Sequence, residues 1–330
     1  MRIARTPRAL CGSRRPIVLA AGFFDGLHRG HMAVLQEAVS RARAMRGTAW
    51  VLTFDRHPLA VLAPGMAPPA LSSRRATLDG FRRLGFAGCL LMPFTPVLAR
   101  LEPGDFIARL TRCRPALAHV VVGRNWKFGR GGAGTPAVLA AMGRRLGFGV
   151  TVVAPVMQGG SPVSSTRLRR AILGGRTVEA SQLLGRPFSL SGLVVRGRGV
   201  GRRLGFPTAN LRWEDAADVL PPDGVYAVHA RVGARVFGGM LNIGVRPTFA
   251  KARPSRRTSE LHLFGFKGSL YGRIIEVEFG PRMRAERRFR SVAALQRQMG
   301  RDAASARDAL ARCDPTASRG RSKRAKWSSP

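Results

Sequence analysis

The chain has 330 residues, a length that allows two domains of ordinary size. Hydrophobic residues make up 45% of it, which is typical of a globular protein and excludes a largely disordered one. No stretch reaches the roughly 18 apolar residues of a membrane span, and the basic start lacks the apolar core of a secretion signal. The sequence therefore predicts a cytoplasmic protein with no membrane association.

The formal net charge is +38, and only five of the 56 basic residues are lysine. Clustered cations favour nucleic acids, because binding releases the counterions of the phosphates. These arginines are instead spread along the chain without interleaved aromatic residues, and an Arg- and Ala-rich codon bias would give the same composition. We expect no specific nucleic-acid partner, although the field should attract anionic substrates such as nucleotides.

The four cysteines are scattered and form no C-x-x-C pair; they are Cys11, Cys89, Cys113 and Cys313. Zinc sites usually draw on closely spaced cysteines, and disulfide frameworks on a denser set in a short secreted chain. We therefore expect neither a zinc site nor a disulfide framework.

The first part of the chain alternates between strand-like and helix-like stretches. Apolar runs predict strands at 16–22, 48–54, 87–94, 118–123 and 150–156. Amphipathic segments predict helices at 31–47, 76–85, 103–113 and 137–147. Buried strands alternating with helices indicate a parallel sheet covered on both faces. The predicted fold over residues 1–184 is an α/β doubly wound, Rossmann-like domain.

The pattern changes near residue 185. Short alternating segments separated by glycines predict the strands of a small antiparallel β-barrel at 191–197, 224–244, 259–266 and 273–280. A helix is expected at 291–312, so the second domain is placed at 185–312. The polar, basic stretch 313–330 is expected to be a disordered tail.

The stretch GFFDGLHRGH (22–31) places His28 and His31 directly after the first predicted strand. Three residues apart at the start of a helix they share a face, and the free N–H groups there favour anions. Gly30 leaves room for close backbone approach. The pair could thus hydrogen-bond to nucleotide phosphates and stabilise charge during phosphoryl or nucleotidyl transfer. A metal site completed by His57 and a purely structural pair are the alternatives.

Two further polar segments each allow two interpretations. Ser164, Ser165 and Thr166 precede a helical run and could cap it, or they could bind phosphate together with the guanidinium of Arg167. In GRRLGFPTANL (201–211), Thr208 and Asn210 present oxygen atoms on one side of an extended segment, which suits Mg²⁺. From the residues alone, a plain turn is favoured for the second segment, and neither capping nor phosphate binding is favoured for the first.

Taken in order, these motifs resemble the bacterial bifunctional riboflavin kinase/FAD synthetase (FMN adenylyltransferase) family. HRGH with the preceding FDG is similar to the H-x-G-H signature of nucleotidyltransferases, and three more motifs of the N-terminal module follow: TFDRHP (53–58), VVGRNWKFGRGGAG (121–134) and SSTRLR (164–169). GRRLGFPTANL then resembles the kinase signature and is followed by PPDGVYAV, NIGVRPTF, ELHLFGF, LYG and RAERRF. The resemblance spans roughly residues 16–312 in two modules.

The resemblance implies two reactions. The barrel would phosphorylate riboflavin with Mg²⁺ and ATP to give FMN, and the first domain would join FMN to the AMP of a second ATP, giving FAD and pyrophosphate. It implies catalytic roles for His28, His31 and Glu260, and a Mg²⁺ site at Thr208 and Asn210. It implies nucleotide or flavin contacts at Gly22, Phe24, Asp25, Asn125, Phe128, Ser164, Ser165, Thr166, Arg167, Gly201, Arg202, Gly205, Phe206, Pro207, Thr208, Asn210 and Arg246.

Several of these residues also have plainer interpretations. Asn125 could be a turn residue, Arg246 could pair with a carboxylate, and a lone Glu260 in a strand would ordinarily face solvent. Four positions depart from the family pattern: Phe23, Arg56, Trp126 and Thr135. Since Phe23 lies in the loop nearest the nucleotide, adenylyl transfer is the activity expected to suffer first.

Other function classes remain open at this point. One is a monofunctional kinase with an impaired adenylyltransferase, and another is a protein that uses its charge to bind RNA or an anionic membrane surface. An adenylyltransferase for pantetheine phosphate or nicotinamide mononucleotide is disfavoured, because it would not need the second domain. The sequence assigns no oligomeric state.

Overall fold

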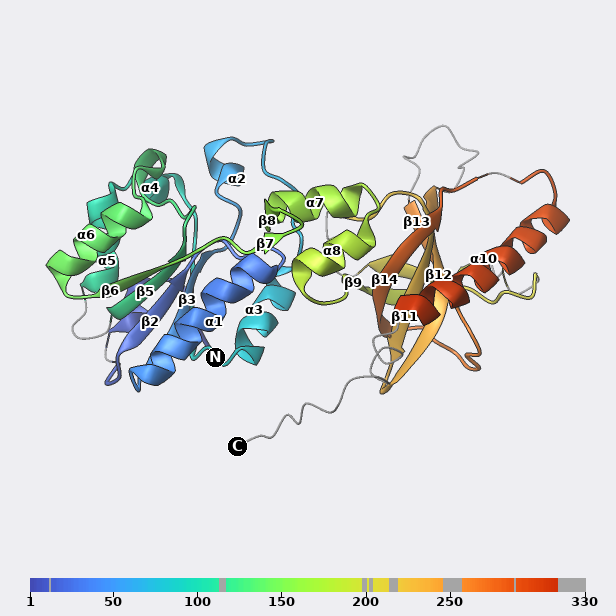
Figure 1. Cartoon of the computed structure of the whole chain (residues 1–330), viewed down its shortest axis with the longest axis horizontal. Coiled ribbons are helices and arrows are strands. Elements are labelled where there is room, and N and C mark those ends of the chain that lie inside the picture. The colour runs from blue at the N-terminus through green and yellow to red at the C-terminus, as the bar shows by residue number, and fades with distance from the viewer. Residues whose placement is uncertain are drawn as a thin grey trace. The chain divides into compact units, whose positions relative to one another are not determined.

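A computed structural model of the chain describes residues 1–11, 13–112, 117–197, 201, 204–213, 219–245, 257–287 and 289–313. The chain divides into two compact units (Figure 1). The first comprises Met1–Leu168 and Leu183–Gly185. The second comprises Arg169–Gln182 and the described residues from Arg186 onward.

The first unit is built on a six-stranded parallel sheet with the order β1-β4-β3-β2-β5-β6 (Figure 1). Its strands are β1 (Arg2–Ala4), β2 (Ile17–Ala21), β3 (Thr48–Phe54), β4 (Gly88–Met92), β5 (Leu117–Gly123) and β6 (Gly149–Val153). Every residue of β2 is buried, as expected for a central strand with helices on both faces.

Helices cover both faces of this sheet, which confirms the doubly wound prediction. On one face Leu19 belongs to a core cluster with Phe106 and Leu139. On the other, Ala20 belongs to a cluster with Leu35 and Phe81. The first layer contains α5 (Pro103–Thr111) and α6 (Pro136–Leu146), and the second contains α1 (Arg29–Ala44) and α3 (Arg74–Arg83). Alternate residues of one strand thus enter opposite layers, as the period of two requires.

Some features of the first part of the chain were not predicted. Strand β1 pairs with β4 at the edge of the sheet, and Cys11 takes part in a disulfide bond, of which the scattered cysteines gave no sign. The other short elements are η1 (Pro7–Leu10), α2 (Leu59–Leu62), α4 (Pro96–Ala99), η2 (Arg130–Gly132), β7 (Met157–Gln158), β8 (Ser161–Pro162), α7 (Ser165–Leu173) and α8 (Thr177–Leu184).

The second unit contains the predicted antiparallel barrel, which is closed and has the strand order β10-β13-β12-β11-β14-β9 (Figure 1). The strands are β9 (Ser189–Val195), β10 (Ala209–Trp213), β11 (Gly224–Val232), β12 (Arg235–Val245), β13 (Arg257–Leu263) and β14 (Ile274–Arg284). Helix α10 (Val292–Cys313) places Ala303 and Ala306 in a core cluster with Val225 and Met240. The small alanines let this helix approach the barrel wall closely.

Within the described ranges, no helix combines the length and the apolar character needed to cross a bilayer.

Candidate active sites

The strand order fixes where a ligand of the first unit would lie. From β2 the chain proceeds to β3 and β4 on one side, and β5 and β6 lie on the other. The order therefore reverses between β2 and β5, and in open α/β sheets ligands bind beyond the carboxyl ends of the strands at such a point. The GFFDGLHRGH segment follows β2 and the GRNWKFG segment follows β5.

His28 and His31 are brought together at the start of α1. His28 is the N-cap residue, and its Nδ1 accepts a hydrogen bond of 3.2 Å from the N–H of His31. The two rings stack with their centroids 3.7 Å apart and an interplanar angle of 18°. A Cβ atom on Gly30 would lie 3.2 Å from the His28 ring, so glycine keeps the pair close. Because Nδ1 is the acceptor, a neutral His28 carries its proton on Nε2.

The surroundings of His31 favour its neutral form. Phe24 lies edge-on to its ring at 5.3 Å, and its Nδ1 is buried with no hydrogen-bond partner among the described residues. Burial, and then the neighbouring charge of His28, lower the pKa of His31 well below its usual value. His31 is thus suited to donate a hydrogen bond from a neutral imidazole rather than to act as a cation.

We expect His31 to stay neutral at pH 6.5, where an ordinary histidine (pKa about 6.5) is half protonated. As the pH falls, the unfolded chain binds this proton before the folded protein does. The titration of His31 therefore lowers the free energy of unfolding below about pH 6.5 and does not change it at higher pH. NMR titration of ¹³C-labelled histidine measures this pKa directly. Replacing His28 with alanine should raise it, and an unshifted His31 pKa in the intact protein would contradict the assignment.

The metal interpretation of the histidine pair gains no support. Among the described residues, no group of three or more His, Cys, Asp or Glu side chains is placed to hold a metal ion. His57 instead accepts the N–H of Leu59 at its Nδ1, at 3.1 Å. Its ring packs edge-on against Phe23 with a centroid distance of 4.9 Å.

Asp25 organises the loop that precedes the histidines. Its side chain is buried, and its carboxylate oxygens accept the N–H groups of Leu71, at 2.9 and 3.2 Å, and of Ser72, at 3.2 Å. Its backbone carbonyl accepts the hydroxyl of Ser165 at 3.1 Å. Asp25 thus joins the first motif to the segment before α3 and to the SSTR motif. Its contact with the nucleotide remains a prediction.

The SSTR segment shows the capping interpretation that the sequence allowed. The Oγ of Ser164 accepts the N–H of Arg167 at 3.2 Å, so it caps the first turn of α7. The guanidinium of Arg167 donates through Nη1 to the carbonyls of Gln158, at 2.7 Å, and Ser161, at 3.0 Å. Thr166 is exposed. A phosphate contact by these residues remains a prediction.

The loop after β5 separates its two candidate residues. Asn125 is exposed in a turn closed by a hydrogen bond from the N–H of Trp126 to the carbonyl of Gly123. Phe128 is buried in the core cluster and stacks on Trp126 at 4.7 Å. The plain turn interpretation fits the geometry of Asn125, and flavin contacts by Asn125 and Phe128 remain predictions.

A cavity of about 260 Å³ in the first unit brings two motifs together. Its walls include residues 23–25 of the first motif and residues 53–57 of TFDRHP, with further residues between 68 and 91. The guanidinium of Arg74, which lines the cavity, donates to the carbonyl of Asp55 at 2.9 Å. Phe23 and Arg56, two of the departures from the family pattern, both line it.

Replacing Phe23 with serine should therefore raise kcat/KM for adenylyl transfer, because it removes an aromatic ring from the cavity wall. We expect an increase of a few fold, roughly the effect of one misfitting group on substrate placement. The kinase half-reaction, measured on the same preparation, should not change. A fall in adenylyl transfer would show that the packing of Phe23 on His57 supports the site instead.

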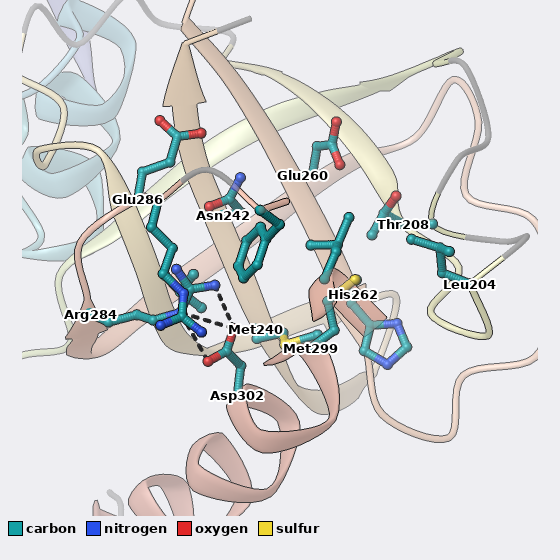
Figure 2. Close-up of a pocket in the computed structure, with 15 residues that line it drawn as sticks. Leu204, Thr208, Met240, Asn242, Glu260, His262, Arg284, Glu286, Met299 and Asp302 are labelled. Carbon is teal, nitrogen blue, oxygen red and sulfur yellow. Dashed lines mark hydrogen bonds and ion pairs between the residues drawn. The ribbon is translucent and has the colours of Figure 1, made fainter. Parts of the chain in front are cut away.

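The second unit encloses a cavity of about 250 Å³ lined by Thr208, Glu260 and Asn242 (Figure 2). Glu260 on β13 pairs in register with Asn210 on β10 and with Asn242 on β12. Directly paired residues point to the same face of a sheet, so a row of three oxygen-bearing side chains crosses neighbouring strands. Asn210 is not among the residues that line the cavity itself.

The GRRLGFPTAN segment is held against this cavity by His262. The ring Nδ1–H of His262 donates to the carbonyl of Pro207 at 2.9 Å, which fixes the residue before Thr208. Phe206 packs edge-on against the same ring at 5.5 Å. A Cβ atom on Gly201 would lie 2.4 Å from the carbonyl of Phe206, so only glycine fits there. Gly205 adopts φ +81°, which also favours glycine.

Sequence reasoning missed most of the cavity wall. The missed residues that line it include Met240, Asn242, His262, Arg284, Glu286, Met299 and Asp302 (Figure 2). Two signals could have found five of them: the period of two that places 240 with 242 and 260 with 262, and the helical spacing of Leu295, Met299 and Asp302. The candidates Arg202 and Arg246 lie outside the described residues.

Comparison with known proteins gives the same division of the chain. Residues 12–167 match the FAD synthetase family and residues 184–310 match the riboflavin kinase family. A solved structure from Streptococcus pneumoniae, described as a macrolide-efflux protein, superposes with a TM-score of 0.82 at 29% identity and covers 93% of this chain and 98% of its own. That description applies to that protein, and the likeness bears on the fold.

Two curated relatives match almost from end to end. The bifunctional riboflavin kinase/FMN adenylyltransferase of Escherichia coli (strain K12) is 36% identical over 292 residues, which is 88% of this chain and 92% of the relative. The protein of the same name from Bacillus subtilis (strain 168) is 34% identical over 288 residues, 86% of this chain and 90% of its own. The chain therefore belongs to the bifunctional riboflavin kinase/FMN adenylyltransferase family.

Proposed function

We propose that each unit carries one half-reaction: the barrel phosphorylates riboflavin to FMN, and the first unit adenylylates FMN to FAD. The observation that carries this division is that each unit has its own cavity, lined by residues of its own motifs; in the first unit these are residues 23–25 and 53–57, and His28, His31 and Arg167 are not among the residues that line it. Membership of the family, with a match in each unit, supports the same pair of reactions.

In the kinase step, we assign Glu260 to accept the proton of the ribityl hydroxyl group as its oxygen attacks the γ-phosphorus of ATP. The new O–P bond forms as the bond to the bridging oxygen of ADP breaks, giving FMN and ADP. The position of Glu260 in the cavity wall supports this role, because it shares that cavity with Thr208.

The residues around Glu260 also fit a magnesium ion. Thr208 and Asn210 carry neutral oxygen donors, and Asn210 lies beside Glu260 in the sheet register. Oxygen ligands of this kind, completed by substrate phosphates and water, are what Mg²⁺ prefers. When bound, the ion would neutralise charge on the phosphates of ATP, while Thr208 and Asn210 hold it.

In the adenylyl step, a phosphate oxygen of FMN attacks the α-phosphorus of ATP, and pyrophosphate leaves as the new P–O bond forms. An ionised phosphate needs no general base, and direct attack needs no covalent enzyme intermediate. We assign His28, His31 and Arg167 to orient the phosphates and stabilise the charge that develops, together with the N-terminus of α1. The stacked, glycine-spaced histidines at that N-terminus support this role.

Two separate assays test the proposal with the purified full-length protein. One supplies riboflavin, ATP and Mg²⁺ and measures FMN, and the other supplies FMN, ATP and Mg²⁺ and measures FAD and pyrophosphate. We expect both products. FMN without FAD would favour a monofunctional kinase, an alternative motivated by Phe23 and Arg56 in the first cavity. Neither product would overturn the assignment.

A further inference from the structure

A partly buried ion pair joins the barrel to the helix beside it. At the end of β14, Arg284 donates from Nε to Asp302 Oδ1 at 3.0 Å and from Nη2 to Oδ2 at 2.6 Å (Figure 2). Asp302 lies on α10, and its side chain is only 6% exposed, against 22% for Arg284. Its Oδ1 also accepts Nε2–H of Gln298 at 2.7 Å. The carboxylate is thus fixed from two sides.

The pair lies in the wall of the cavity that also contains Glu260 and Thr208. In Figure 2, Arg284 and Asp302 lie on one side of the labelled residues, and Glu260 and Thr208 on the other. Apolar groups line the same cavity: Met240 and Met299, together with Phe289, whose ring lies 5.8 Å from the guanidinium; the charged Glu286 and Arg287 line it as well. These apolar side chains suit a flat aromatic ring system, whereas the oxygen atoms of Glu260 and Thr208 suit phosphoryl transfer.

The guanidinium has donors beyond those that the pair uses. Nε–H and one N–H of Nη2 bind Asp302, and Nη1 donates to the carbonyl of Ala285 at 3.0 Å. A guanidinium has five N–H groups, so two more can serve a ligand. Without a partner, the long arginine side chain would have to be ordered by the ligand itself, at the cost of conformational entropy. Because the bidentate carboxylate of Asp302 already orders the Arg284 guanidinium, the ligand does not bear that entropic cost.

We propose that Asp302 is a positioning residue of the kinase reaction: it holds the Arg284 guanidinium in the cavity wall, where Arg284 donates to a hydrogen-bond acceptor on the ring of riboflavin. This inference rests on the proposed kinase function of the barrel. Asp302 itself touches Arg284 and Gln298, and it acts on the substrate through Arg284.

The test uses the Asp302→Asn variant of the full-length protein, in which the amide keeps the shape but loses the charge. We expect the KM for riboflavin to rise about tenfold, as for the loss of a charge-assisted hydrogen bond, with a much smaller change in kcat. Adenylyl transfer from FMN should be unchanged. Asp308→Asn, at an exposed position of the same helix, is the matched control and should keep the wild-type KM.

A double-mutant cycle separates positioning from a purely structural role. If Asp302 acts through Arg284, Asp302→Asn should add no further rise in KM to an Arg284→Met variant. An equal rise in both backgrounds, or a wild-type KM in Asp302→Asn, would overturn the proposal. Should Asp302→Asn not fold, Asp302→Glu decides: an intermediate KM supports the role and an unchanged KM refutes it. If the wild-type protein makes no FMN, the kinase assignment itself fails.

Discussion

Replacing both His28 and His31 with alanine should abolish FAD formation from FMN while FMN formation from riboflavin continues. The two imidazoles stack at the N-terminus of α1, where phosphate charge develops in the proposed reaction. Loss of one preorganised donor typically costs about 10²–10³ in rate, and losing both should leave adenylyl transfer below detection. Chromatography of a reaction with riboflavin, ATP and Mg²⁺ measures both flavin products at once.

The kinase half-reaction is the internal control in this experiment, because the barrel has its own cavity. A matched control in the first unit is His119→Gln, which changes a histidine that instead bonds Thr151 at 2.8 Å. That variant should still make FAD. Near-normal FAD synthesis by the double alanine variant would refute a role for the histidines in catalysis.

Replacing Glu260 with glutamine should produce the reverse pattern. The amide fills the same space in the barrel cavity but no longer accepts the hydroxyl proton, so kcat for FMN formation should fall about 10²–10⁴-fold. FAD formation from supplied FMN should continue at the wild-type rate. Initial rates of the two half-reactions, measured separately on one preparation, give the comparison.

Glu278→Gln serves as the control for this substitution. Glu278 lies on β14 and faces Arg231 at 3.7 Å, and it is not among the residues that line the cavity. The KM for ATP should change little in Glu260→Gln if the carboxylate acts on the hydroxyl rather than on the nucleotide. A Glu260→Gln enzyme with wild-type kcat would show that Glu260 is not the proton acceptor.

The sequence predicted the architecture because the decisive signals are local. A buried run such as residues 17–21 needs helices on both faces, and the prediction of a strand at 48–54 matches the observed bounds. Strand β1 was missed because three residues, two of them exposed, carry too short a pattern. It forms a strand because it pairs with the edge of β4, where Arg2 lies opposite Gly88, 86 residues later in the chain.

The candidate sites likewise contain features that a local pattern predicts and features that depend on residues far apart in the chain. His28 and His31 meet within one helical turn, so their spacing alone predicts that they lie together. Asp25 instead bonds backbone groups 46 and 47 residues away, and no local pattern indicates that its carboxylate would be engaged there. The row of Asn210, Glu260 and Asn242 depends on the register of three strands. Register is a property of the closed barrel, which single segments do not encode.

The central claim is that two independent sites, one in each unit, perform the two steps in sequence. Mixing the Glu260→Gln variant with the His28→Ala/His31→Ala variant, in the presence of riboflavin, ATP and Mg²⁺, tests it most directly. Neither variant alone should make FAD from riboflavin. The mixture should accumulate FMN and then FAD, because FMN released by one protein is the substrate of the other. FMN accumulating in the mixture without any FAD would contradict the account.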